Sequence, residues 1–342
     1  MITTILLVAF LGLLFGLILA FASQFFAVEQ DERIAQIEVI LPSANCGACG
    51  YPGCSAFAVA VAKGEAPVTG CIPGGDNVSH QIADLLGEEP SESEPMMAVV
   101  HCAGGTKEAK ERAIYDGIED CWAAELAGGG SKECSAGCLG LSSCVKVCAF
   151  DALHITDNGI ALVDPEKCTG CGECVAACPR NLIEMIPKSQ KIFLACNTPD
   201  RGSKVKKYCS VGCTACTLCV KASPTPGSIE MQGNLPRLAT HTTESFVASK
   251  YKCPSNCFTD LIPTRPVANI ATHCTGCGLC VPVCPVKNTI TGEANERFVI
   301  DKSTCIGCGI CVPACPEKAI SMWGALGYEE KHRRSNTSRH YF

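Results

Sequence analysis

The chain has few of the residues from which many binding and catalytic sites are built. Aromatic residues make up 6% of its 342 residues, and its 7 histidines form no pair with metal-ligand spacing. The formal net charge of -6 argues against nucleic acid as a partner, because nucleic acid is normally met by a basic surface. No GxGxxG fingerprint follows a predicted strand, and no threonine-based flavin attachment signature occurs. We therefore expect no nicotinamide or flavin site in this chain.

Cysteine, by contrast, is abundant: 29 residues occur in compact groups. Disulfides, zinc and iron–sulfur clusters are the three chemistries that explain such groups. Disulfide frameworks belong to short secreted chains, and an odd number of cysteines at three-residue steps fits them poorly. Structural zinc normally uses two separated CxxC pairs. Iron–sulfur clusters are favoured, and metal binding would also supply folding free energy to small cores.

The first 28 residues contain no charged side chain, and Glu29 is the first. This apolar run exceeds the roughly 20 residues that cross a bilayer as a helix. The alternative is a cleaved signal peptide, because Ala20-Phe21-Ala22 resembles a cleavage site. However, no basic residue precedes the run, and the run is longer than a usual signal core. We predict a single-pass anchor in the cytoplasmic (inner) membrane, with the soluble part on the cytoplasmic side, where thiols stay reduced.

The predicted fold class is α+β: one transmembrane helix, a small helical 4Fe–4S domain, and several small bacterial-ferredoxin-like modules. Shifts in composition and the cysteine groups give the boundaries. The expected order is an anchor at 1–28, a 4Fe–4S domain at 29–80, an acidic linker at 81–98, a ferredoxin-like module at 99–187, a degenerate module at 188–265, a two-cluster module at 266–321 and a polar tail at 322–342.

The last module carries the clearest motif, CTGCGLCVPVCP followed by CIGCGICVPACP. In this bacterial ferredoxin spacing, three cysteines of a run bind one cluster and the fourth ligates the other. The predicted ligand sets are Cys274, Cys277, Cys280 and Cys315 for one cluster, and Cys284, Cys305, Cys308 and Cys311 for the other.

The ferredoxin-like module at 99–187 has its second cysteine run in CTGCGECVAACP. Its first run has Leu141 where a middle cysteine is expected. Cys134, four residues upstream of that run, can supply the missing ligand. The predicted sets are Cys134, Cys138, Cys144 and Cys178 for one cluster, and Cys148, Cys168, Cys171 and Cys174 for the other.

The degenerate module has Ser223 in place of a fourth cysteine. We predict one cluster on Cys213, Cys216, Cys219 and Cys257, with Cys253 as the alternative fourth ligand and Cys209 as a further candidate. The competing interpretation is that this module has lost its clusters and keeps structural thiols. The two middle modules are diverged copies, because the offsets of four and six residues in Cys134-Cys138-Cys144 recur in Cys209-Cys213-Cys219, and a lone cysteine, Cys102 or Cys196, precedes each triplet. The pattern assigns no role to Cys102, Cys121 or Cys196.

The first cysteine unit is different: Cys46, Cys49 and Cys54 lie in a glycine-rich loop, and Cys71 returns after a predicted helix. Four thiols placed in this way suit one 4Fe–4S cluster beside the membrane. The segment lacks the basic and hydroxyl residues of a phosphate-binding loop.

This unit, directly after an N-terminal span, resembles the B subunit of the Rnf complex. The likeness continues through GCLGLSSC, VDPEKCTGCGECVAACP and KVKKYCSVGCTACTLC, and covers roughly residues 1–260. The first unit alone is also similar to part of the corrinoid protein of the acetyl-CoA pathway. The anchor and the ferredoxin-like modules favour Rnf. The degenerate module and the additional module at 266–321 depart from the family pattern and leave the cluster count and the ferredoxin docking site open.

The resemblance implies an electron-transfer subunit of an ion-translocating ferredoxin:NAD oxidoreductase. Such a protein exchanges electrons with soluble ferredoxin and relays them through its clusters, while partner subunits reduce NAD and pump Na⁺ or H⁺. In this chain, the ligand sets predicted above give about six 4Fe–4S clusters. Lys204, Lys206 and Lys207 form a small basic group that suits an acidic ferredoxin, although a solvated loop explains it equally well. The alternatives are a component of another membrane oxidoreductase and a zinc-binding scaffold.

Overall fold

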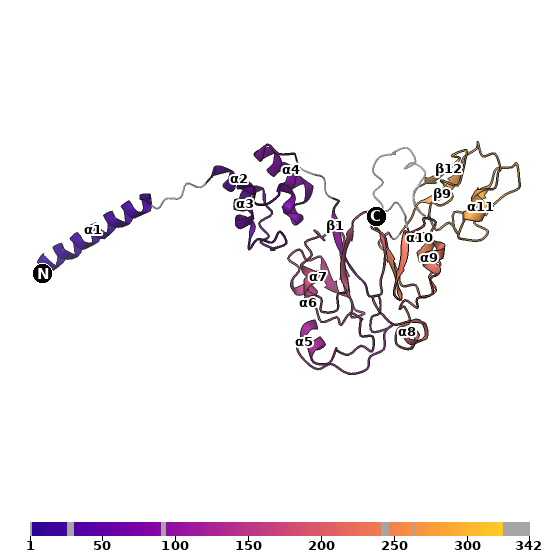
Figure 1. Ribbon diagram of the computed structural model, residues 1–342, viewed down its shortest axis with the longest axis horizontal. Coiled ribbons are helices and arrows are strands. Elements are labelled where there is room, and N and C mark those ends of the chain that lie inside the picture. The colour runs from indigo at the N-terminus through magenta and orange to yellow at the C-terminus, as the bar shows by residue number, and fades with distance from the viewer. Residues whose placement is uncertain (1, 26–30, 90–93, 241–245, 263, 324–342) are drawn as a thin grey trace. The chain divides into compact units, whose positions relative to one another are not determined.

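The computed structural model describes the chain apart from residues 1, 26–30, 90–93, 241–245, 263 and 324–342. Side chains are also not described for residues 2–9 and 22–25. Apart from one N-terminal helix of 24 residues, the described residues form short helices and short strands, which confirms the mixed helix and strand content expected from the sequence (Figure 1). They divide into two compact units, Met1–Glu92 and Ser93–Phe342.

Helix α1 runs from Ile2 to Phe25 and contains no charged residue. Over the residues that are described, the structure contains no helix that is both long and apolar enough to cross a membrane. Of the predicted anchor at 1–28, residues 1 and 26–28 lie outside the described residues.

The rest of the first unit is a small helical domain. It contains α2 (Glu32–Ile40), α3 (Cys54–Ala62) and α4 (Gly75–Leu86), with the 3₁₀ turns η1 (Val68–Gly70) and η2 (Ile72–Gly74) between the last two helices. Ile37, Phe57 and Ile82 are almost completely buried and pack into one core. Since burial of apolar surface is the main source of stability, this core fixes the helices and the cysteine loops attached to them.

In the second unit, three long-range antiparallel strand pairs each join the beginning and the end of one stretch of chain. Inside each stretch lies a short antiparallel hairpin. The outer pairs are β1 (Met96–Val100) with β4 (Ile183–Pro187), β5 (Ile192–Leu194) with β8 (Phe258–Asp260), and β9 (Val267–Ile270) with β12 (Ile320–Trp323). The hairpins are β2 (Leu153–Ile155) with β3 (Ala161–Val163), β6 (Ile229–Gln232) with β7 (Leu235–Leu238), and β10 (Ile290–Thr291) with β11 (Val299–Ile300). Figure 1 shows β9 beside β12 in the last stretch. The same small architecture thus occurs three times, and we call the three stretches modules A, B and C.

The helices of the modules are only one or two turns long, and several begin at the cysteine runs. The residue before α6, α7 and α9 is Ser142, Gly172 or Thr217, each in the left-handed conformation. This conformation reverses the chain between two cysteines and starts a new turn at once. The module helices are α5 (Cys121–Leu126), α6 (Ser143–Lys146), α7 (Glu173–Ala177), α8 (Gly202–Tyr208), α9 (Leu218–Ala222), α10 (Val247–Tyr251) and α11 (Cys280–Val283).

Modules A and B are joined by direct backbone hydrogen bonds. The Ala103 amide donates to the Ala195 carbonyl at 3.0 Å, and the Lys110 amide donates to the Tyr208 carbonyl at 2.8 Å. Ala109 also forms an isolated bridge with Cys209. The long loop that follows β1 therefore lies against the start of module B.

Candidate metal centres

All 29 cysteines are described, and none of them is in a disulfide. The first group lies in the helical domain, where Cys54 begins α3 and Cys71 separates η1 from η2. Burial raises the pKa of Cys71, and the sulfurs of Cys54, Cys49 and Cys46 raise it further. These interactions require proximity, so the structure brings together the four cysteines predicted here. Asn45 fixes the loop by accepting a hydrogen bond from the Cys54 amide at 2.8 Å.

Module C brings together both predicted sets. Burial, together with the nearby sulfurs of Cys308, Cys305 and Cys284, raises the pKa of Cys311 to about 12. These four cysteines line one cavity with about 340 Å³ of empty space. At the other set, burial raises the pKa of Cys280, with Cys274, Cys277 and Cys315 as the charged neighbours.

Module A contains one predicted set unchanged. Burial raises the pKa of Cys174 to about 12, and the nearby sulfurs are those of Cys168, Cys171 and Cys148. The Ala98 amide in β1 donates to the sulfur of Cys168 at 3.4 Å. Strand β1, the first strand of module A, thus donates a hydrogen bond to a cysteine in the last cysteine run of the module.

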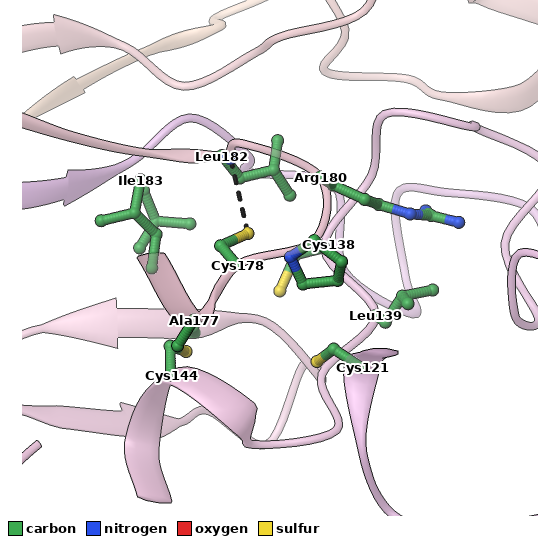
Figure 2. A pocket seen from close by; sticks show the side chains of 12 residues that line it. Cys121, Cys138, Leu139, Cys144, Ala177, Cys178, Arg180, Leu182 and Ile183 are labelled. Carbon is green, nitrogen blue, oxygen red and sulfur yellow. Dashed lines mark hydrogen bonds between the residues drawn. The ribbon is translucent and has the colours of Figure 1, made fainter. Parts of the chain in front are cut away.

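The second group of module A differs from the predicted set. Cys121, Cys138, Cys144 and Cys178 surround one cavity with about 370 Å³ of empty space (Figure 2). Burial, together with the sulfurs of the other three, raises the pKa of Cys144 to about 12. The structure does not place Cys134 in this cavity. Cys121 takes its place because α5 carries it there from outside the cysteine run.

Two side chains fix Cys121 at the cavity. The Asp120 carboxylate caps α5 by accepting from the amides of Trp122 and Ala123. The Ser143 hydroxyl accepts from the Cys121 amide at 2.7 Å and donates to Asp120 at 2.7 Å. In the sequence, Asp120 indicates a helix that begins at Cys121. The spacing of the cysteines, however, does not connect Cys121 to a cysteine run more than a dozen residues away.

Module B collects five cysteines around one cavity: Cys213, Cys216, Cys219, Cys253 and Cys257. The sulfurs of Cys253 and Cys257 are 3.3 Å apart. The structure therefore brings both alternative fourth ligands to the same place, and the surrounding loop distinguishes them.

A recurring loop follows the last cysteine of three other runs. In each, the residue three positions on is left-handed, and the amide four positions on donates to the cysteine sulfur. The cysteines are Cys148, Cys178 and Cys315, the left-handed residues are Asp151, Asn181 and Lys318, and the donors are Ala152, Leu182 and Ala319, at 3.4, 3.4 and 3.3 Å.

Cys253 begins the same loop in module B. Asn256 is left-handed with φ 52°, and the Cys257 amide is hydrogen-bonded to the Cys253 sulfur. Cys253 is thus the counterpart of Cys178 and Cys315, and Cys257 occupies the position of their amide donors.

Four cysteines remain: Cys102, Cys134, Cys196 and Cys209. They line a further cavity, with about 360 Å³ of empty space, where modules A and B meet. Burial raises the pKa of Cys196 to about 12, and it also raises the pKa of Cys134 and Cys209. The cysteine spacing did not predict this grouping, because the four cysteines come from four separate loops.

The donor set fits iron–sulfur clusters. Thiolate is a soft ligand that selects zinc, copper(I) or iron–sulfur clusters. Among the described residues, no three side chains of the metal-ligating types converge closely enough for a single ion. Backbone amides point at the sulfurs, as in the Ala98, Leu182 and Ala319 bonds, and such bonds tune cluster potentials. Repeated ferredoxin-like modules with thiol-lined cavities define the class: an iron–sulfur protein with several clusters.

Comparison with known proteins agrees with this class. Family models described as "Putative Fe-S cluster", "4Fe-4S binding domain" and "4Fe-4S dicluster domain" match residues 41–73, 161–184 and 273–320. They fall on the helical domain, on module A and on module C.

Relatives identify the family. The B subunit of the Na(+)-translocating ferredoxin:NAD(+) oxidoreductase complex of Acetobacterium woodii is 39% identical, over 72% of this chain and 74% of the relative. The B subunit of the ion-translocating oxidoreductase complex of Methanosarcina acetivorans is 35% identical, over 84% of this chain and 97% of the relative. The proton-translocating counterpart of Clostridium ljungdahlii is 39% identical, over 59% and 72%. The chain belongs to this family, the B subunits of Rnf complexes, which confirms the resemblance inferred from the sequence.

Proposed function

We propose that this chain is the iron–sulfur electron-transfer component of an Rnf-type ferredoxin:NAD oxidoreductase. The observation that carries the proposal is the arrangement of buried thiols in groups of at least four, in a chain that belongs to the family of Rnf B subunits. NAD chemistry and ion translocation belong to partner subunits. The coupling ion is left open, since one relative is named for sodium and another for protons.

The protein's part in this function is to hold, insulate and tune redox centres. A bound 4Fe–4S cluster supplies a one-electron redox centre whose potential depends on hydrogen bonds and solvent exposure. Burial raises the pKa of thiols such as Cys144, Cys174 and Cys311 to about 12, so metal loading must displace their protons. Amides directed at the sulfurs then stabilise the negative charge that remains.

The structure favours a revised ligand list for six clusters. Cys121 replaces Cys134 in module A, and Cys253 replaces Cys257 in module B, each because of its position in the fold. The sets are Cys46, Cys49, Cys54 and Cys71; Cys121, Cys138, Cys144 and Cys178; Cys148, Cys168, Cys171 and Cys174; Cys213, Cys216, Cys219 and Cys253; Cys274, Cys277, Cys280 and Cys315; and Cys284, Cys305, Cys308 and Cys311.

Two surfaces connect these centres to other molecules. Residues 1–28, uncharged throughout, anchor the chain as a single span in the cytoplasmic membrane, with the modules on the cytoplasmic side. Helix α8 presents Lys206 and Lys207 to solvent, while Lys204 pairs with Asp200 at 2.8 Å. This basic group suits an acidic ferredoxin, because complementary charge mainly accelerates encounter.

The test is reduction of the anaerobically purified chain by reduced ferredoxin, followed by visible absorbance in a stopped-flow instrument. We expect bleaching by ferredoxin to the level that dithionite reaches, and slower bleaching in a Lys206→Glu/Lys207→Glu variant at low salt. Bleaching by dithionite alone would assign the chain to a different electron donor. Zinc in place of iron on metal analysis would exclude electron transfer altogether.

A further inference from the structure

The cavity between modules A and B is not used by the six clusters of the proposed function. We propose that Cys102, Cys134, Cys196 and Cys209 bind a seventh 4Fe–4S cluster there. Four features support this site: the equivalence of the four thiols in pairs, their hydrogen bonds, a buried cation beside them and the cavity that they line.

The four cysteines are two equivalent pairs from the two diverged modules. Cys102 lies two residues after β1, and Cys196 lies two residues after β5, which are the first strands of modules A and B. Cys134 and Cys209 each lie four residues before a cysteine that lines the cavity of their own module, Cys138 and Cys213. Each module thus contributes the same two positions to a site between them.

The sulfurs lie within electrostatic range of one another. Beyond the effect of burial, Cys209 raises the pKa of Cys134, and Cys102 raises the pKa of both Cys209 and Cys196. This chain of interactions joins all four thiols. They line one cavity whose empty space, about 360 Å³, lies between the 340 Å³ and 370 Å³ of the cavities at Cys305 and Cys144.

Backbone amides point at these sulfurs in a symmetric pattern. The Cys138 amide donates to the sulfur of Cys102 at 3.3 Å, and the Cys213 amide donates to the sulfur of Cys196 at 3.3 Å. Because Cys138 and Cys213 are equivalent positions, the two bonds are equivalent as well. Hydrogen bonds to cluster sulfurs are a standard feature of iron–sulfur sites, and a buried structural thiol does not need them.

A buried lysine provides the matching charge. Lys132 is only 3% exposed, and its ammonium donates to the Gly104 carbonyl at 2.7 Å. Lysine is almost never fully buried unless it is paired with a negative charge. Burial raises the pKa of Cys209 and Cys138, and the positive charge of Lys132 partly offsets this effect. A cluster held by four thiolates is anionic, and it supplies the counter-charge that this position requires.

Glycines keep the cavity open. A Cβ atom on Gly104 would come within 3.1 Å of the Cys209 sulfur, and one on Gly212 would come within 2.4 Å of Val205. Small residues are needed where a backbone approaches a ligand closely. The site therefore has the ligands, the charge and the room for a cluster.

The position gives this cluster a specific place in the electron path. Cys102 accepts from the amide of Cys138, a proposed ligand in module A, and Cys196 accepts from the amide of Cys213, a proposed ligand in module B. The seventh site is therefore one hydrogen bond away from a neighbouring site on each side. It links the centres of module A to the centre of module B.

The test is iron and acid-labile sulfide per chain in the full-length protein, purified and reconstituted anaerobically. We expect about 28 irons per chain rather than about 24, because seven clusters contribute four each. Cys209→Ala is expected to lose about four irons together with one set of EPR signals. The matched control is Ser210→Ala, which changes the exposed residue next to Cys209 and should keep the full iron content.

A second variant separates ligand loss from misfolding. Cys102→Ala should lose the same four irons, and the Cys102→Ala/Cys209→Ala double variant should lose no more than either single variant. Losses that add, or an unchanged iron content in both single variants, would overturn the seventh site. A wild-type content of about 24 irons with normal ferredoxin reduction would overturn it and leave the proposed function intact. One zinc per chain in place of the four irons would overturn it as well and assign the site to a structural metal.

Discussion

At the scale of single residues, Cys253 and Cys257 show how backbone geometry selects a ligand where sequence spacing does not. Their sulfurs lie 3.3 Å apart in one cavity, so distance alone does not separate them. The loop does, because Cys253 has the left-handed residue and the amide donor that follow Cys178 and Cys315.

We predict that Cys253→Ala removes the module B cluster, whereas Cys257→Ala keeps it. The reason is that a ligand must keep its sulfur directed at the iron, while the Cys257 position supplies mainly an amide. Iron analysis and EPR of the two variants measure the difference. Equal iron loss in both, or loss in Cys257→Ala alone, would reverse the assignment.

Lys132 should set the potential of the cluster between the modules. Replacing it with methionine removes a buried positive charge, which disfavours the reduced, more negative form of that cluster. We predict a lower midpoint potential, by on the order of tens of millivolts, with the iron content retained. Potentiometric EPR measures the shift. Lys107→Met, which changes an exposed lysine in the loop after β1, is the control and should leave all potentials unchanged.

Residues also show where prediction from sequence stops. Cysteines within one loop, such as Cys168, Cys171 and Cys174, could be grouped from their spacing, because a single loop reaches three corners of a cluster, and the structure places them near one another. Cys121 and Cys102 could not be assigned, since their partners come from loops that only the tertiary fold brings together. Spacing alone groups Cys134 with the nearest run in sequence, but in the fold it lines the cavity that module A shares with module B.

At the scale of elements, the first glycine of each CxGC turn is held against another backbone segment. A Cβ on Gly170 would lie 2.6 Å from the Met96 carbonyl oxygen, and one on Gly307 would lie 2.4 Å from that of Pro266. Both glycines have positive φ. These two turns therefore fix the cysteine loop to the start of its module, at Met96 in β1 and at Pro266 directly before β9.

Gly307→Ala should destabilise the last module far more than Gly309→Ala. Both positions have positive φ, which costs an alanine about 1 kcal/mol, but only Gly307 has a backbone oxygen in the way, and nothing lies within 4 Å of a Cβ on Gly309. We expect the cluster at Cys305 to bleach at least tenfold faster on mild heating in Gly307→Ala. Similar bleaching rates in the two variants would show that the close approach to Pro266 carries no weight.

Arg180 ties the loop around α5 to the core of module A. Its side chain is 5% exposed, and it donates to the Glu125 carboxylate at 2.7 Å and to the carbonyls of Gly129 and Gly137 at 2.6 and 2.7 Å. Arg180→Met should lower the free energy of opening this loop by about 3 kcal/mol, because it leaves the partners of a buried guanidinium unpaired.

Hydrogen–deuterium exchange of residues 121–138 measures this opening. Arg112→Met provides the control, since Arg112 is exposed and, among the described residues, its side chain donates to the neutral carbonyls of Gly128 and Gly130 without an ion pair. Substitution of an exposed residue should change stability by no more than about 0.5 kcal/mol. Exchange that is equally slow in Arg180→Met and the wild type would contradict the role given to Arg180.

At the scale of the whole molecule, the metal centres and the N-terminal helix are separate features of the chain. Deleting residues 1–30 should move the protein, expressed without partner subunits, from the membrane fraction to the supernatant. The iron content per chain should not change, because every cysteine lies beyond this segment. Fractionation and iron analysis test both statements. A truncated protein that still sediments with salt-washed membranes would place the anchor elsewhere.

The order of the cysteine units was predictable because each run carries its own spacing, whereas the junction between modules A and B was not. No local pattern encodes the bond from the Ala103 amide to the Ala195 carbonyl, or the pairing of Ala109 with Cys209. These contacts depend on how two copies of a fold pack together, and periodicity within one copy carries no information about them.

The pairing of the first and last strands has a consequence for how such chains grow. In module C, Val267 lies opposite Trp323, so the two ends of the module are neighbours in space. A duplicated module can therefore be inserted into the chain without a change in the structure of the segments on either side. The addition of two further clusters to the electron-transfer path then requires only a short connecting segment, such as the one between Asp260 and Val267.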